Sequence, residues 1–83
     1  IAASGATVYW GMIASNAYPF GTQIRFPDLY GDKIFVVKDR MHTRYQSRID
    51  IWFPEYSRAS RFGLRNTRIE IVRLAKPDQL SLK

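Results

Sequence analysis

The 83-residue sequence has no cysteine and a single histidine. Without cysteine there is neither a disulfide framework nor a thiolate metal site, and cysteine usage says nothing about the redox compartment. One histidine excludes a metal site built from several histidines, and it argues against a Ser-His-Asp triad. Carboxylates, aromatic rings and basic side chains are therefore the groups from which a site would be built.

Long apolar runs are missing as well, which excludes a transmembrane helix in this sequence. The chain lacks the leader of a signal peptide, and its start at Ile1 favours a processed or excised piece of something longer. It also lacks a phosphate-binding P-loop, a dinucleotide fingerprint and the aromatic signature of an RRM.

The composition that is present, 46% hydrophobic and 24% charged, is typical of one small soluble domain. Thirteen Lys and Arg against seven Asp and Glu give a net charge of +6. This balance favours polyanionic partners, and nucleic acid, an anionic lipid surface and an anionic wall polymer all qualify. The basic residues are spread from Arg25 to Lys83, which argues against a disordered basic tail.

Short apolar segments with a two-residue rhythm predict five or six strands, at residues 7–10, 12–14, 23–26, 33–38, 48–53 and 68–74. In the fifth, Ile49, Ile51 and Phe53 share the inward face, opposite Arg48, Asp50 and Trp52. In the last, Ile69, Ile71 and Val72 are expected to be buried. A short helix is expected between Tyr56 and Phe62, ended by Gly63, and residues 76–83 read as a tail. So many strands in so short a chain predict a small, closed, mostly β barrel.

Five of the seven carboxylates fit structural roles in turns, at the helix start, on an outward strand face or in the tail: Asp28, Asp32, Glu55, Glu70 and Asp78. Asp39 and Asp50 differ, since the first follows an apolar strand and the second interrupts one, where aspartate is disfavoured. One interpretation makes them structural ion pairs with Arg40, Arg44 or Arg48, and spacing alone favours it. The other is a carboxylate acid/base beside an aromatic surface, since Trp52 lies on the same strand face as Asp50, and this arrangement suits a carbohydrate substrate.

The histidine and the aromatic side chains, which could also take part in a site, have simpler interpretations. His42 lies in a predicted loop, where a hydrogen-bonding role is favoured over that of a general base. The tyrosines and tryptophans are expected mostly in the core or at its rim.

An ordered set of short motifs runs through residues 3–73: Ala3-Ser4-Gly5, Ile13-Ala14, Pro19-Phe20-Gly21-Thr22, Val36-Val37-Lys38-Asp39, Arg48-Ile49-Asp50, Ala59, Phe62-Gly63 and Ile69-Glu70-Ile71. This set resembles the 3D domain, a family named for three aspartates and seen in membrane-bound lytic transglycosylase A and stationary-phase survival proteins. More distantly it resembles rare lipoprotein A and the expansins.

The resemblance implies a six-stranded double-psi β-barrel over residues 1–75, here nearly without its first strand, acting on peptidoglycan outside the cytoplasm. It implies that Asp50 is the catalytic acid/base of a lytic transglycosylase and that Asp39 assists it, with no metal or cofactor. We expect the glycan to be contacted by Trp52, Arg40, His42, Arg48 and Asn16.

Two departures from the family pattern bear on this function. The first of the three aspartates is replaced by Ala14, and the usual Gly-Gly-Ala after the second is replaced by Arg40-Met41-His42. These changes favour an alternative, a non-catalytic barrel that binds glycan or an anionic wall polymer, whereas the retained aspartates favour the enzyme. Additional domains or a partner strand are further expectations. Nucleic-acid binding driven by the positive charge is a third hypothesis, but the basic residues fall on different predicted elements and no nucleic-acid partner is expected.

Overall fold

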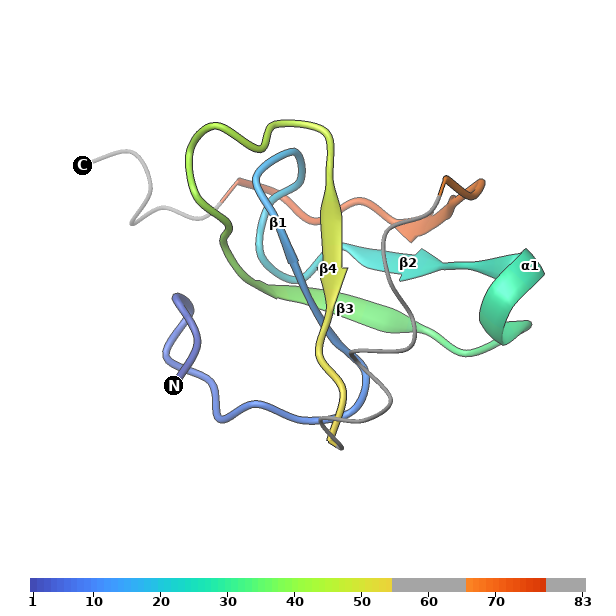
Figure 1. The fold of residues 1–83 in the computed structure, drawn as a ribbon, viewed down its shortest axis with the longest axis horizontal. Helices are drawn as coiled ribbons and strands as arrows, with labels where there is room; N and C mark the ends of the chain where they lie inside the picture. The colour runs from blue at the N-terminus through green and yellow to red at the C-terminus, as the bar shows by residue number, and fades with distance from the viewer. Residues whose placement is uncertain (55–65, 78–83) are drawn as a thin grey trace.

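The computed structural model of this chain describes residues 1–54 and 66–77, and this part is mostly β. A single five-stranded sheet is accompanied by one short helix, α1 (Pro27–Tyr30). The strands are β1 (Met12–Ser15), β2 (Gln23–Arg25), β3 (Phe35–Asp39), β4 (Ile49–Ile51) and β5 (Glu70–Arg73) (Figure 1). The helix predicted between Tyr56 and Phe62, and most of the predicted tail, lie outside the described residues.

The sheet has the order β4-β1-β3-β2-β5, so neighbours in the sheet are mostly not neighbours in the chain. β1 and β3 are parallel, whereas the β1–β4, β2–β3 and β2–β5 pairs are antiparallel. Consequently β1 and β2 run antiparallel with β3 between them, and β3 and β4 run antiparallel with β1 between them. The sheet is strongly twisted, since β1 and β4 run across the direction of β2 and β3 (Figure 1).

The predicted closed barrel with six strands is not what the described residues form. Their sheet has five strands and is open, with β4 and β5 at its two edges. The expected strand at 7–10 is absent, because Gly11 adopts a φ of 121° and the Met12 amide bonds back to the Tyr9 carbonyl in a turn. No helix in the described ranges has the length and apolarity that a membrane crossing requires.

The core lies on one face of the sheet and collects the inward positions of β1 to β4. Its buried members are Ile13, Ile24, Phe26, Phe35, Val37 and Ile51. Ile49 and Phe53 pack against this cluster, as the alternation in 48–53 predicts. Ile69 packs there too, but the prediction that Ile71 and Val72 are buried is wrong. Both are exposed, and β5 lies at the edge of the sheet, where β2 is its one partner among the described residues.

Candidate acid/base site

Two carboxylates flank one small residue in the middle of the sheet. Ala14 on β1 pairs with Asp50 on β4 at one side and with Asp39 on β3 at the other. The two aspartates, eleven positions apart in sequence, are thus separated by a single strand, or about 10 Å between backbones. The middle position, Ala14, carries only a methyl group.

A register shift between β1 and β3 decides which way Asp39 faces. Ile13 pairs with Val37, but the next residue of β1, Ala14, pairs with Asp39, so Lys38 is the extra residue. Without this irregularity, strict alternation would put Asp39 on the core face together with Val37. The extra residue turns Asp39 to the face shared by Ala14 and Asp50, in keeping with the frequent use of bulges beside active sites.

The pKa of Asp50 is shifted upward from that of an ordinary aspartate. Its side chain is exposed, yet the strand surface around it removes part of the hydration of the carboxyl. This desolvation raises the pKa of Asp50, and the negative charge of Asp39 raises it further. The proton is therefore retained to higher pH than on an ordinary aspartate.

Asp39 is held by backbone amides. Its Oδ1 accepts hydrogen bonds from the Ala3 amide at 2.8 Å and from the Arg40 amide at 2.9 Å. The Ser4 amide donates to the Lys38 carbonyl at 3.2 Å, so the N-terminal segment lies along the end of β3. These contacts hold the Asp39 carboxylate in one orientation at the end of β3.

The alternative of structural ion pairs with nearby arginines does not describe these two acids. Two ion pairs join described residues, Arg25 with Glu70 and Arg68 with Asp28, and neither aspartate takes part in them. Arg40, the nearest candidate, directs Nη1 to the carbonyls of Ser15 and Tyr18 and stacks on the Phe20 ring. Arg44 and Arg48 both lie over the Tyr45 ring.

The loop between β3 and β4 is fastened to the end of β1 by Asn16. The Asn16 side chain donates to the carbonyls of Met41, His42 and Tyr45 at 2.9–3.0 Å and accepts from the Met41 amide at 3.0 Å. Asn16 was predicted to contact glycan. In the structure it orders the loop that carries His42 and Arg48, and its contact with glycan stays a prediction.

Replacing Asn16 by Ala is expected to lower the free energy of unfolding by about 1–3 kcal/mol, because three loop carbonyls and one amide lose their partner. Urea unfolding followed by circular dichroism measures the change. Asn66→Ala is the matched control, since Asn66 is exposed outside any strand or helix. Equal midpoints for the two variants would contradict the role of Asn16 as a loop fastener.

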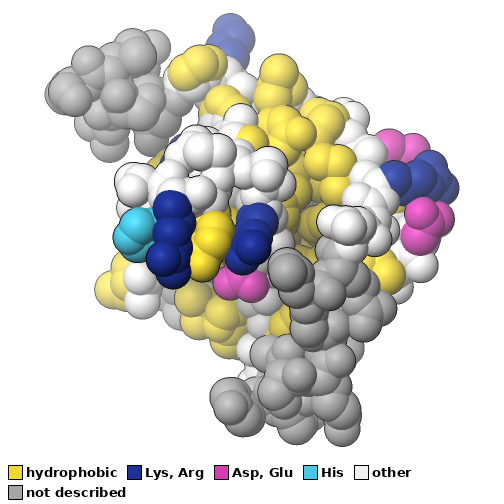
Figure 2. Space-filling model, turned by 45° about the horizontal axis from the view of Figure 1, so that its top comes forward, with side chains coloured by type: hydrophobic (Ala, Val, Ile, Leu, Met, Phe, Trp, Pro, Cys, Tyr) yellow, Lys and Arg dark blue, Asp and Glu magenta, His cyan; other side chains and the backbone are white. Residues whose placement is uncertain are grey.

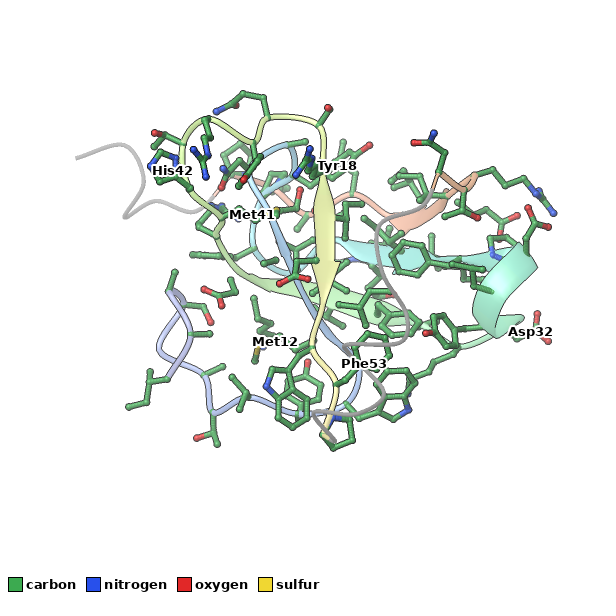
Figure 3. All side chains as sticks on the ribbon, in the orientation of Figure 1. Met12, Tyr18, Asp32, Met41, His42 and Phe53 are labelled. Atoms are coloured by element: carbon green, nitrogen blue, oxygen red, sulfur yellow. The ribbon has the colours of Figure 1, made fainter. Side chains whose placement is uncertain are left out.

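His42 and Trp52, the other two predicted contacts, lie at different depths. His42 is exposed on the long loop and its Nδ1 accepts the Arg44 amide, which confirms the predicted loop hydrogen-bonding role. Figure 3 places it at the opposite end of the molecule from Asp32, which lies beyond α1. Trp52 follows β4, is half-buried, and its amide donates to the Met12 carbonyl.

Sequence reasoning missed two contributors to this region. Tyr45 is expected in the core or at its rim, yet the guanidinium groups of Arg44 and Arg48 lie over its ring. The sequence signal for this contact is an aromatic residue between two arginines in a loop. The Ala3 amide was missed as a partner of Asp39, and no sequence signal indicates it.

Comparisons with protein-family models, with curated proteins and with solved structures gave no match for this chain. Among the described residues, no group of three or more His, Cys, Asp or Glu side chains is placed to hold a metal ion.

Proposed function

We propose that this chain is a peptidoglycan-cleaving domain of lytic transglycosylase type, working outside the cytoplasm, with Asp50 as the acid/base and Asp39 in support. The observation that carries the proposal is the row Asp39, Ala14, Asp50. The resemblance to the 3D domain assigns these positions to its three aspartates, and strand pairing and the register shift bring them side by side on one face.

The topology supports a double-psi barrel as the complete fold. In a psi motif, two antiparallel strands that follow each other in the chain have a third strand inserted between them. The pair β1 and β2 encloses β3, and the pair β3 and β4 encloses β1, so the two motifs interlock. We propose that closure of this sheet to a six-stranded barrel needs a further strand beyond the five described.

One carboxyl group serves both halves of the proposed reaction. The Asp50 carboxyl gives its proton to the oxygen that links N-acetylmuramic acid to N-acetylglucosamine, and this bond breaks. The resulting carboxylate takes the proton of the C6 hydroxyl of the same muramic acid, whose oxygen bonds to the anomeric carbon. The product is a 1,6-anhydro sugar, and Asp50 ends protonated as it began.

Asp39 prepares Asp50 for the first of these steps. Its negative charge disfavours the ionised form of Asp50 and so adds to the population of the protonated form, which the first step uses. The charge also stabilises the positive character that develops at the anomeric carbon as the bond breaks.

The second candidate function is a barrel that binds glycan without cleaving it, and Ala14 in place of an aspartate favours it. Digestion of purified sacculi, with muropeptides identified by mass spectrometry, separates the two. The enzyme is expected to release 1,6-anhydro muropeptides. Reducing ends in their place would overturn the transglycosylase chemistry, and binding to sacculi without any product would support the second candidate.

The substitution Ala14→Asp is expected to raise the pKa of Asp50 beyond its value in the unchanged chain, because a third carboxylate then lies directly beside it. Carbon NMR of the Asp50 carboxyl during a pH titration measures this shift, and Ala14→Asn is the uncharged control of matching shape. Release of anhydro muropeptides should extend to higher pH in Ala14→Asp alone. An unchanged titration of Asp50 would show that the three positions are not adjacent.

A further inference from the structure

The loop between β3 and β4 presents a patch that the acid/base chemistry does not use. We call Arg44, Tyr45 and Arg48 the arginine–tyrosine patch. The guanidinium of Arg44 lies 4.9 Å from the centroid of the Tyr45 ring and that of Arg48 lies 4.6 Å from it. In Figure 2 a hydrophobic side chain is flanked by two basic ones on the near face, with the histidine to one side and an acidic side chain beneath.

The patch is ordered and available. Both arginines are exposed, and neither forms an ion pair with a described acidic residue. Contact with the ring limits the freedom of both side chains. The Asn16 side chain donates a hydrogen bond to the Tyr45 carbonyl, and this bond holds the backbone of the patch in place. Two guanidinium groups around one ring are thus preorganised to donate to an oxyanion, and planar carboxylates match their geometry.

The position of the patch limits what the oxyanion belongs to. Arg48 precedes Asp50 by two residues on the outward side of the chain, a separation of about 7 Å along an extended backbone. A long polyanion crossing both places would set negative groups against Asp39 and Asp50. A neutral main chain over the acids, with an anionic branch over the arginines, fits both charges. Peptidoglycan has this form, since its sugars are uncharged and its peptide stems carry carboxylates.

We propose that the arginine–tyrosine patch binds a free carboxylate of the peptide stem on the muramic acid whose bond Asp50 cleaves. This specificity rests on the proposed function. It assigns to Arg44 and Arg48 a preference for stems with free carboxylates over stems in which these groups are amidated.

The test uses two soluble peptidoglycan fragments of equal glycan length, one with free stem carboxylates and one with amidated stems. Isothermal titration calorimetry gives the Kd of each, and product analysis gives the rate. We expect the chain to bind the free form about tenfold more tightly. In the double variant Arg44→Gln, Arg48→Gln this preference should vanish, whereas Arg73→Gln, which removes an exposed charge on β5, should keep it. Tyr45→Leu, which removes the ring, should weaken the preference.

The failures of the two proposals can be told apart. Product release with no preference between the fragments would overturn the carboxylate site and leave the acid/base proposal standing. A preference that depends on both arginines, without any product, would keep the site and overturn catalysis. Single-stranded DNA is the third probe. If it bound more tightly than either fragment, and if the double variant lost this binding, the patch would be assigned to nucleic acid and the carboxylate proposal would be overturned.

Discussion

Asp50→Asn is expected to reduce the release of 1,6-anhydro muropeptides by about 10²–10⁴-fold, to the limit of detection, because the amide neither gives nor takes the proton at the scissile oxygen. Asparagine has nearly the shape and size of aspartate, so glycan binding should remain. The measurement is product formation from purified sacculi at a fixed protein concentration, together with co-sedimentation to record binding.

The stability of the same variant separates catalysis from folding. The pKa of Asp50 is raised in the fold, so ionising it costs more in the folded chain than in the unfolded one. This cost is absent at pH values below the ordinary aspartate pKa of 3.8, and it is fully present at pH values above the raised pKa of the folded chain. Asn removes the cost, so the free energy of unfolding of Asp50→Asn relative to the unchanged chain should rise through that window.

Asp50→Asn is thus predicted to lose activity while its free energy of unfolding near neutral pH equals or exceeds that of the unchanged chain. Asp32→Asn serves as the matched control, because Asp32 is exposed and lies at the far end of the molecule. It should leave both product and binding unchanged. If Asp50→Asn released as much product as Asp32→Asn, the acid/base assignment would be wrong, whatever the stability of the two variants.

The five strands that the described residues form, and the inward face of β4, were predictable because alternation is a local property, whereas the strand expected at 7–10 is absent. Ile49, Ile51 and Phe53 are spaced by two, and any strand through them must put them on one side. The turn at Gly21 was predictable for the same reason, since its φ of 92° suits glycine. The edge position of β5 was not, because the exposure of Ile71 and Val72 depends on which strands lie beside them and not on their own pattern.

The candidate site was predictable in its members more than in its geometry. Asp50 is a carboxylate inside an apolar strand, which is a local conflict that functional sites often show. Asp39 would face the core if the alternation of β3 continued unbroken, and only the extra residue Lys38 in the pairing with β1 reverses it. Such a register shift depends on how two strands pair, so it cannot be predicted from the sequence of either strand alone.

Phe35→Ala is the substitution from which we expect the largest loss of stability, about 3–5 kcal/mol. Phe35 is fully buried at the start of β3, and three aromatic rings contact its own ring with centroids 5.1–5.4 Å away, those of Trp10, Phe26 and Tyr30. Removing the ring opens a cavity against large, rigid neighbours that cannot collapse into it. In a domain this small the remaining stability is marginal.

Urea unfolding measures this loss, with Tyr9→Ala as an aromatic control, because Tyr9 is 39% exposed and outside the core cluster. Near-equal losses in the two variants would show that Phe35 is not the centre of the core. The consequence extends to the site, because β3 runs from Phe35 to Asp39 and its pairing with β1 sets the direction of that carboxylate. Phe35→Ala should therefore lower the pKa of Asp50 toward its ordinary value at urea concentrations where the unchanged chain is still folded.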